Sequence, residues 1–328
     1  MLTLDRAVVP ATEYLRADDL WIITTYFNPQ RYITKRANYD RFITKIISGG
    51  LNYVVVELAF NDQAFELPVG QNILRIRGRA VMWQKERLLN VALASLPEAC
   101  RKVVWLDCDI EFENHAWALE MSAVLDDYVV AQPYDVAVRL PKDAITYDGG
   151  RAITYRSFCA VAKEWPEFAR SGQYDLHGHT GFAWGARRSL LQAFGFYDTC
   201  IVGNGDHAMA HGFLNDTRSR CLAWMATLPQ LEHFAIWSDK VSREVGGRVS
   251  YVKGVCLHYW HGSKANRLYW ERAQTLSDHG FDPATDLRID SNGCWAWASD
   301  KPALHTWARD YFATRQEDGS DDDASNGL

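Results

Sequence analysis

The sequence of 328 residues lacks a run of 18 apolar residues, a Cys-x-x-Cys pair and an internal repeat. The first absence argues against a membrane-spanning helix, and residues 1–19 also lack the apolar core of a secretory signal. Because the seven cysteines show no paired spacing, they predict reduced thiols, not a disulfide framework or a zinc knuckle. We therefore expect a cytoplasmic protein.

A surplus of positive charge is also absent. The formal net charge is −6, and residues 316–328 hold five acidic residues and no basic one, so the rest of the chain is nearly neutral. A nearly neutral body argues against a protein that coats nucleic acid. The composition of residues 316–328 predicts a disordered acidic tail after a single domain at residues 1–315.

Aromatic residues, in contrast, are abundant: they make up 13% of the chain and include 13 Trp. Hydrophobic residues are 48% and charged residues 23%, the balance of a globular protein with a sizeable core. The tryptophans fit either a Trp-rich core or a surface that handles carbohydrate, because aromatic rings suit sites with one apolar and one wet side.

The first half of the chain alternates apolar runs with amphipathic segments, which predict buried strands and helices. This alternation is typical of an α/β protein with a mostly parallel sheet flanked by helices. The second half is less regular. Expected strands are residues 20–27, 52–59, 71–76, 102–106 and 249–258, and expected helices are residues 32–47, 83–95, 155–164, 187–194, 205–214, 232–245, 264–279 and 302–314.

The most informative stretch is the apolar strand 102–106, which runs directly into Asp107-Cys108-Asp109. Ligands of parallel sheets bind beyond the carboxyl ends of the strands. Two carboxylates one residue apart at such an end can turn toward one cation, Mn²⁺ or Mg²⁺, which a diphosphate can also coordinate. The alternative is a solvated loop in which Asp109 caps a helix.

The order of short motifs resembles that of nucleotide-sugar glycosyltransferases with the GT-A (Rossmann-like) fold, in particular β-1,4-galactosyltransferases and polypeptide N-acetylgalactosaminyltransferases. The resemblance covers about residues 19–272. It implies a donor half at about 19–130 and an irregular acceptor and metal half at about 131–272. Beyond the resemblance, we expect C-terminal helical packing at 273–315. The motifs are WQKERLLN at 83–90, Asp107-x-Asp109, TGFAWG at 180–185, GNGD at 203–206 and HYWHG at 258–262.

The resemblance implies that the donor meets the end of the first strand and the helix that begins near residue 83. Glu57 would accept a hydrogen bond from the base or ribose, or else forms an ion pair at the sheet edge. Arg77 fits a phosphate contact or an ordinary surface position. Gln84 and Lys85 lie at a helix N-terminus, a natural anion site, or on a solvated helix face. The expected nucleotide contacts are Thr24, Thr25, Tyr26 and Asn28.

A further metal signal follows the strand at 249–258. His258 is expected as a ligand beside the two carboxylates, and Lys264 as a diphosphate contact, by resemblance to retaining GT-A enzymes such as glycogenins. This chain has His261 where those enzymes have glycine, so His261 is a reserve ligand. A structural histidine at a strand end is the alternative.

Small and aromatic residues alternate at 177–185, which predicts close approach of the backbone to the transferred sugar, with Trp184 stacking on a ring, or else a tight turn before a helix. His177-Gly178-His179 also suggests a metal site, which we disfavour because no cysteine or acidic residue nearby has matching spacing. Expected sugar or acceptor contacts are His179, Thr180, Gly181, Trp184, Gly205, His207 and His261.

Asp206 is the acid in the GNGD turn and is expected to be the base that deprotonates the acceptor hydroxyl; its alternative is a helix N-cap. The similar galactosyltransferases have consecutive acids here, whereas this chain has Asp206-His207, so His207 is a second candidate. A base at Asp206 implies inversion at the anomeric carbon, and the likeness to glycogenins implies retention. We expect inversion.

These features predict a metal-dependent glycosyltransferase that moves a hexose from a nucleotide-diphosphate sugar, with UDP as the expected nucleotide. The acceptor stays open among a glycan, a lipid-linked sugar, a protein hydroxyl and a modified DNA base. One alternative is a nucleotidyltransferase, although residues 25–29 after the first strand do not form a Gly-rich basic loop. Another is a non-catalytic carbohydrate-binding protein.

Overall fold

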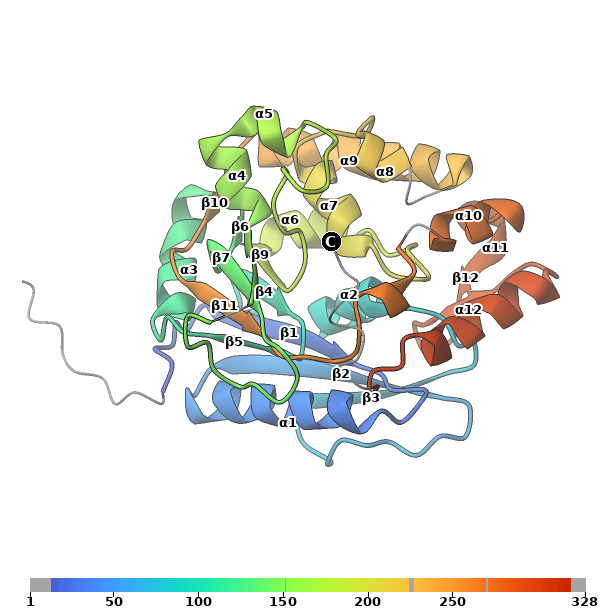
Figure 1. The fold of residues 1–328 in the computed structure, drawn as a ribbon, viewed down its shortest axis with the longest axis horizontal. Helices are drawn as coiled ribbons and strands as arrows, with labels where there is room; N and C mark the ends of the chain where they lie inside the picture. The colour runs from blue at the N-terminus through green and yellow to red at the C-terminus, as the bar shows by residue number, and fades with distance from the viewer. Residues whose placement is uncertain (1–12, 151, 224–226, 270, 320–328) are drawn as a thin grey trace, which may run out of the picture.

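A seven-stranded sheet forms the centre of the computed structural model, which describes residues 13–319 apart from 151, 224–226 and 270 (Figure 1). Every strand is parallel to the others except β9, which runs antiparallel to both neighbours. The expected fold class, a mostly parallel sheet flanked by helices, is therefore confirmed. In spatial order the strands are β10 (Val249–Tyr251), β6 (Val130–Gln132), β9 (Ala183–Arg187), β4 (Lys102–Leu106), β1 (Leu20–Tyr26), β2 (Asn52–Phe60) and β3 (Ile73–Gly78).

Successive residues of the central strands enter two different cores, because side chains of a strand alternate between its faces. Ile22 packs in the core that contains Phe42 of α1 (Ile33–Ser48) and Met121 of α3 (Trp117–Asp127). Ile23 packs in the other core, with Leu88 of α2 (Lys85–Ser95). That second face is also covered by α4 (Phe158–Glu164), α5 (Pro166–Ala169), α6 (Arg188–Phe194), α7 (Gly205–Phe213), α8 (Arg220–Ala223) and α9 (Leu228–Val245).

A smaller four-stranded sheet brings two distant segments together. The chain leaves β4 through residues 107–109 and enters β5 at once, and β5 pairs antiparallel with β11 so that Ile110 lies opposite His258. The backbone N–H of Tyr259 donates to the carbonyl of Asp109 over 2.9 Å. The end of β11 is therefore fixed beside the acidic pair. The order is β5 (Ile110–Phe112), β11 (Val255–His258), β7 (Val136–Arg139) and β8 (Ile153–Arg156).

The C-terminal part packs beside α2 as a separate layer (Figure 1). Met82 contributes to its core, together with Phe281 and Leu304. The layer contains the turn η1 (Ala265–Arg267), α10 (Glu271–Asp278), α11 (Pro283–Asp286), the hairpin of β12 (Leu287–Ile289) and β13 (Trp295–Trp297), and α12 (Pro302–Thr314).

The expectation of a disordered tail at residues 316–328 is wrong for residues 316–319; residues 320–328 lie outside the described part. Glu317 is buried. The Asp318 carboxylate accepts hydrogen bonds from the backbone N–H groups of Ile33 at 2.8 Å and Thr34 at 2.7 Å. These are among the unpaired donors of the first turn of α1. The composition of the tail hid this role, because an acid that caps a helix looks like a solvated acid in a sequence.

Two expected elements in the second half are divided. The strand expected at 249–258 is β10 followed by β11, which belong to different sheets. The helix expected at 264–279 is the short turn η1 and then α10, with Leu268 at φ 49° between them. Within the described residues, none of the helices combines the length and apolar character that crossing a bilayer needs.

Candidate functional site

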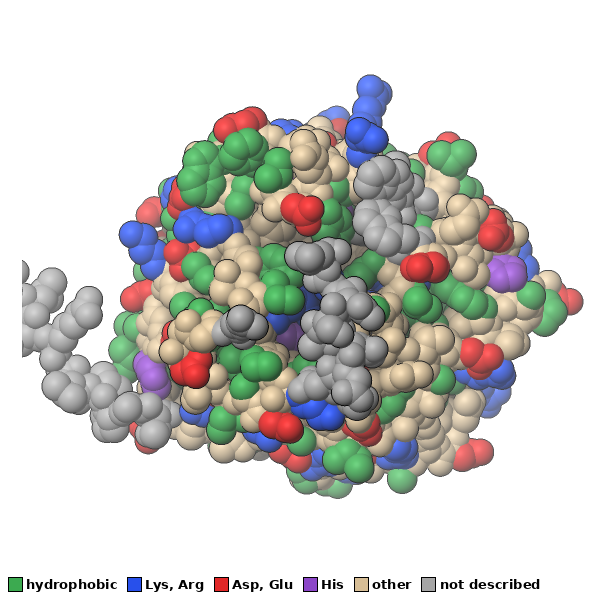
Figure 2. Space-filling view, viewed as in Figure 1, with side chains coloured by type: hydrophobic (Ala, Val, Ile, Leu, Met, Phe, Trp, Pro, Cys, Tyr) green, Lys and Arg blue, Asp and Glu red, His purple; other side chains and the backbone are tan. Residues whose placement is uncertain are grey.

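A pocket opens beyond the carboxyl ends of β1 and β4, where Thr25 and Asp107 line it. Its other sides come from residues 179–182 before β9, the N-terminus of α7, the segment after β11, and Arg315 after α12. Figure 2 shows basic and histidine side chains set back from the surface near the centre of this face. This is the place where parallel α/β sheets bind ligands.

Asp109, His258 and His261 form a group that could hold a metal ion, since their donor atoms all lie within 4.8 Å of one another. Oδ2 of Asp109 is 3.2 Å from Nε2 of His261, and Nε2 of His261 is 3.0 Å from Nε2 of His258. Oδ1 of Asp109 is buried and has no hydrogen-bond partner among the described residues. One carboxylate and two imidazoles are a donor set that fits a divalent first-row cation.

The pKa shifts of this group follow from its burial. Burial and the nearby Asp107 raise the pKa of Asp109 to about 7. Burial lowers the pKa of His261 to about 3, and burial and Arg139 hold the pKa of His258 well below its usual value. The two imidazoles are therefore neutral at neutral pH, which is the form that binds metals.

Asp107 lies at the pocket but faces a different partner. Its Oδ1 is 2.5 Å from Nζ of Lys85, and it is not part of the three-residue group. The expected convergence of Asp107 and Asp109 on one point is therefore not what this structure shows. His261, expected only as a reserve ligand, lies in the group beside His258.

Lys85 lies between Asp107 and Asp206, the expected base, and contacts both. Its Nζ lies 2.9 Å from Oδ2 of Asp206, in the first turn of α7. Burial disfavours the charge of Lys85, but Asp107 and Asp206 outweigh it and raise the pKa of Lys85 well above its usual value. Burial also raises the pKa of Asp206, although Lys85 opposes the shift. The structure thus places Asp206 and Lys85 in the pocket.

Gly205 does not line the pocket; it gives α7 room beside α2. A Cβ at this position would overlap the carboxyl group of Glu86, which is itself buried. Burial and the negative charge of Asp206 raise the pKa of Glu86 to about 8. Glycine is required here by close packing, not by contact with a sugar.

Basic side chains that sequence reasoning missed line the same pocket. They make it strongly electropositive: burial would raise the pKa of Tyr269, yet Arg267 and three further arginines outweigh burial and lower it to about 8. Burial and Arg315 lower the pKa of Arg267 to about 10. These residues are spread over most of the chain, so no local motif marks them. They are Lys35, Arg139, Arg267, Arg272 and Arg315.

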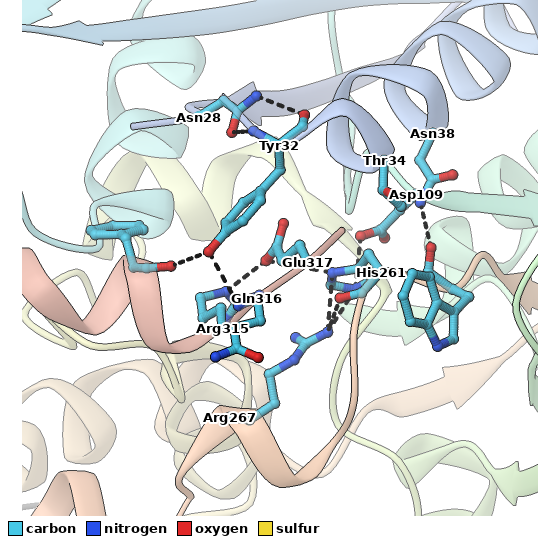
Figure 3. A network of polar contacts seen from close by, with 12 residues as sticks. Asn28, Tyr32, Thr34, Asn38, Asp109, His261, Arg267, Arg315, Gln316 and Glu317 are labelled. Atoms are coloured by element: carbon cyan, nitrogen blue, oxygen red, sulfur yellow. Dashed lines mark hydrogen bonds and ion pairs between the residues drawn. The ribbon is translucent and has the colours of Figure 1, made fainter. Parts of the chain in front are cut away.

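Figure 3 shows how residues 315–317 meet the group of Asp109 and His261. Nε of Arg315 donates to Glu317 over 2.6 Å, and the same carboxylate lies 3.5 Å from Nδ1 of His261. Arg267 contacts His261 from the other side at 3.0 Å. Gly262, at φ 89°, lies against the backbone of residues 315–317, where a Cβ would be 3.0 Å from two carbonyl oxygens.

Lys264, expected to contact a diphosphate, is exposed and does not line the pocket; its Nζ lies over the ring of Tyr155 at 6.0 Å. Arg267 faces the metal group instead. The turn η1 causes this difference, because it directs the residue three places further along the chain toward His261.

Several expected donor contacts hold the fold together instead. Of the residues at the end of β1, Thr25 lines the pocket, whereas Oγ1 of Thr24 donates to the carbonyl of Leu106 over 2.7 Å. The hydroxyl of Tyr26 donates to Glu66, and Nδ2 of Asn28 donates to the same carboxylate over 3.2 Å. Neither Thr24, Tyr26 nor Asn28 lines the pocket.

Glu57, Arg77 and Gln84 also lie outside the pocket lining. Glu57 accepts from the backbone N–H of Leu67 over 3.0 Å and so fixes the loop after β2. Nη1 of Arg77 donates to the carbonyl of Gln63 over 2.9 Å. The side chain of Gln84 accepts from the backbone N–H of Trp295 over 2.7 Å, which joins α2 to the C-terminal layer.

On the acceptor side, His179, Thr180 and Gly181 line the pocket, and so does His207. Trp184 does not. It is buried in the core, its ring is stacked on that of Trp105, and Nε1 donates to the carbonyl of Thr180 over 2.7 Å. Part of this glycine-rich segment, which was expected to approach the sugar or to form a tight turn, is the central strand β9, which explains why its tryptophan points into the core.

No protein-family model matches the chain, and no curated protein matches it in sequence. Solved structures do match. Staphylococcus aureus TarS in complex with UDP-GlcNAc is 14% identical with a TM-score of 0.35, over 75% of this chain and 60% of TarS. The alignment thus spans less than two thirds of TarS. Drosophila β-1,4-galactosyltransferase 7, in complex with manganese, UDP-Gal and xylobiose, is 9% identical with a TM-score of 0.40, over 90% and 98% of the two chains.

Mycobacterium tuberculosis glucosyl-3-phosphoglycerate synthase, in complex with Mn²⁺, UDP and phosphoglyceric acid, is 14% identical with a TM-score of 0.38, over 88% of this chain and 91% of the synthase. Similarity of this degree does not establish an activity for this chain. The fold class rests on the sheet topology, and the function rests on the pocket.

Proposed function

We propose that this protein is a metal-dependent glycosyltransferase that moves a hexose from a nucleotide-diphosphate sugar, with UDP-sugars as the expected donors, to an acceptor hydroxyl. The observation that carries the proposal is one pocket that combines a possible metal group, a cluster of arginines and a carboxylate on the facing helix. Asp109, His258 and His261 would hold Mn²⁺ or Mg²⁺. The bound cation would offset negative charge on the leaving diphosphate.

The arginines support a diphosphate as the ligand. Arg267 and Arg315 lie beside the metal group, and guanidinium groups match phosphate oxygens in geometry and charge. The lowered pKa of Tyr269 reports the same positive field. A neutral sugar alone would not need this field, so it disfavours a protein that merely binds carbohydrate.

Asp206 is the proposed base. It is half-buried at the pocket, and burial raises its pKa, which makes it a stronger proton acceptor than an exposed carboxylate. The acceptor oxygen would attack the anomeric carbon while its proton passes to Asp206 and the bond to the diphosphate breaks. Lys85 holds Asp206 in place and keeps it ionised. Attack on the face opposite the leaving diphosphate would invert the anomeric centre.

The test is to incubate the protein with a panel of UDP- and GDP-sugars, with and without Mn²⁺, and to follow release of free nucleotide. We expect Mn²⁺-dependent cleavage of one donor, and a product of inverted configuration by NMR once an acceptor is found. Asp206→Asn should lower transfer by roughly 100-fold or more while Mn²⁺ and UDP still raise the melting temperature.

Two results would contradict the proposal. The first is that no nucleotide sugar is cleaved or stabilises the protein. The second is release of pyrophosphate from a nucleoside triphosphate and a sugar phosphate, which would identify a nucleotidyltransferase.

A further inference from the structure

We propose that His177, His207, His211 and Cys221 bind a zinc ion in a closed structural centre, separate from the metal group of the pocket. All four residues are buried, and one donor atom from each lies within 4.8 Å of the others. Zn–N and Zn–S bonds of about 2.0–2.3 Å place tetrahedral ligands roughly 3.5 Å apart, so a small contraction completes the site. Three imidazoles and one thiolate supply the four nitrogen and sulfur donors that a tetrahedral zinc ion needs.

Four of the six imidazole nitrogens of this cluster are buried and unpaired among the residues that the structure describes. Nε2 of His177, Nε2 of His211 and both ring nitrogens of His207 are buried and have no hydrogen-bond partner within the described part of the chain. Buried polar atoms are nearly always paired, and leaving several unpaired in one place is costly. A cation at the centre of the cluster satisfies one nitrogen from each ring.

The outward-facing nitrogens of two of the rings are held as zinc ligands require. Nδ1 of His177 lies 2.7 Å from the carbonyl of Gly178, and Nδ1 of His211 lies 2.9 Å from Oδ2 of Asp216. Each Nδ1–H therefore donates outward, and the lone pair of Nε2 remains for the cluster. Carbonyl and carboxylate partners of this kind orient histidine ligands in zinc sites.

The ligands come from three separate segments of the chain. His207 and His211 are one helical turn apart in α7, so they share a face; Cys221 is in α8, and His177 precedes β9. This explains why the sequence did not reveal the site. No cysteine or acidic residue lies near His177-Gly178-His179 at the spacing of a zinc site, and His207 and His211 come only after α6. On binding, the Cys221 thiol would lose its proton to solvent and ligate as the thiolate.

A packed cluster of neutral rings without metal is the simpler alternative. The rings do pack: the centroid of His207 is 5.3 Å from that of Tyr174, and that of His211 is 5.5 Å from that of Phe158. Packing alone does not explain why the unpaired nitrogens of three rings and a thiol converge at one point. Aromatic walls also give a zinc centre the dry surroundings in which it is closed to other ligands.

The site would fix two segments of the pocket. Asp206 directly precedes His207, and residues 179–181 follow His177 closely. A zinc ion joining these segments would hold the proposed base and the acceptor side at a constant separation. This consequence depends on the proposed function, but the zinc site does not.

The test uses untagged full-length protein, so that an affinity tag contributes no histidines. We expect one tightly held zinc per chain by elemental analysis after dialysis. Replacement of zinc by Co²⁺ should give a thiolate-to-cobalt charge-transfer band. Cys108 lines the pocket beside Asp109, so the band is assigned to Cys221 only if it disappears in Cys221→Ser. The readout needs neither UDP-sugar nor Mn²⁺.

Cys221→Ser should abolish the charge-transfer band and the retained zinc, whereas Cys294→Ser, which removes a buried thiol elsewhere, should keep both. If Cys221→Ser fails to fold, the spectrum and zinc content of the unaltered protein still decide. Protein that holds no zinc and shows no charge-transfer band after refolding with Zn²⁺ or Co²⁺ overturns the proposal, whatever its transferase activity.

Discussion

The two histidine groups of this protein have similar ligands but different surroundings. Asp109, His258 and His261 line a pocket beside arginines, and one oxygen of the Asp109 carboxylate has no hydrogen-bond partner in the part of the chain that the structure describes. The side chains of His177, His207, His211 and Cys221 are all buried, although His207 also borders the pocket. Three ligands at an open pocket leave room in the coordination shell for a substrate, whereas four enclosed ligands complete it. Exposure thus separates a group suited to chemistry from one suited to stability.

The largest expected effect is the loss of protein stability when the proposed zinc site is removed. Cys221→Ala should lower the free energy of unfolding by roughly 4 kcal/mol, because a bound metal is lost with its ligand. The measurement is urea denaturation with zinc present. A chelator should bring the unaltered protein down to the level of the variant and leave the variant itself unchanged. Cys294→Ala is the matched control, because it removes a buried thiol that is not one of the proposed zinc ligands. Its stability should fall on chelation as that of the unaltered protein does.

The complementary variant in the open group is Asp109→Asn. It should lower Mn²⁺-dependent cleavage of the donor by roughly 100-fold, because the one carboxylate of the group becomes a weak ligand. Its melting temperature without metal should not fall, since the substitution also removes a carboxylate that burial and Asp107 disfavour. A large loss of stability together with intact cleavage would reverse the comparison between the two groups.

Helix α7 belongs to both regions, and Gly205→Ala tests that connection. The added Cβ would overlap Glu86, and the first turn of α7 would have to move. We expect a loss of about 2 kcal/mol in stability from overpacking, with reduced donor cleavage and reduced zinc retention. Adding Glu86→Ala should recover part of the stability, which a double-mutant cycle measures. Effects of the two substitutions that simply add would show that the helix does not press on Glu86.

The smallest expected effect concerns pH. The folded-state pKa of Glu86 is raised to about 8 from 4.5, so the folded protein holds this proton more tightly than the unfolded chain. Stability from this group is complete below about pH 4.5 and is lost as the pH rises toward 8. Glu86→Gln, which cannot ionise, should therefore raise the melting temperature by a few degrees at pH 8 and by less at pH 5. An equal gain at both values would mean that Glu86 titrates normally.

Much of the donor half could be predicted from the sequence. The apolar strands and the helix near residue 83 have strong periodic patterns, and parallel strands place their carboxyl ends on one edge. That geometry correctly placed Thr25, Asp107 and Asp109 at the pocket, and the histidine motif placed His258 there. The roles proposed for these residues stay predictions.

Polar residues near the same edge were harder to assign. Glu57 and Gln84 bind backbone groups of loops that the sequence did not define. Because of the short turn η1, Arg267 lies at the pocket where Lys264 was expected. A polar side chain that hydrogen-bonds to the backbone of a loop and one that binds a ligand look the same in a sequence. Only the position of the loop distinguishes them.

The sequence by itself determined the alternation of strands and helices and the acidic pair at the end of β4, because local periodicity and strand order are properties of neighbouring residues. Tertiary structure alone decided three features. It paired Asp107 with Lys85 while Asp109 lies beside two histidines, it gathered arginines from distant segments around one pocket, and it brought three histidines and a cysteine together. These features depend on contacts between segments far apart in the chain, and no local pattern encodes such contacts.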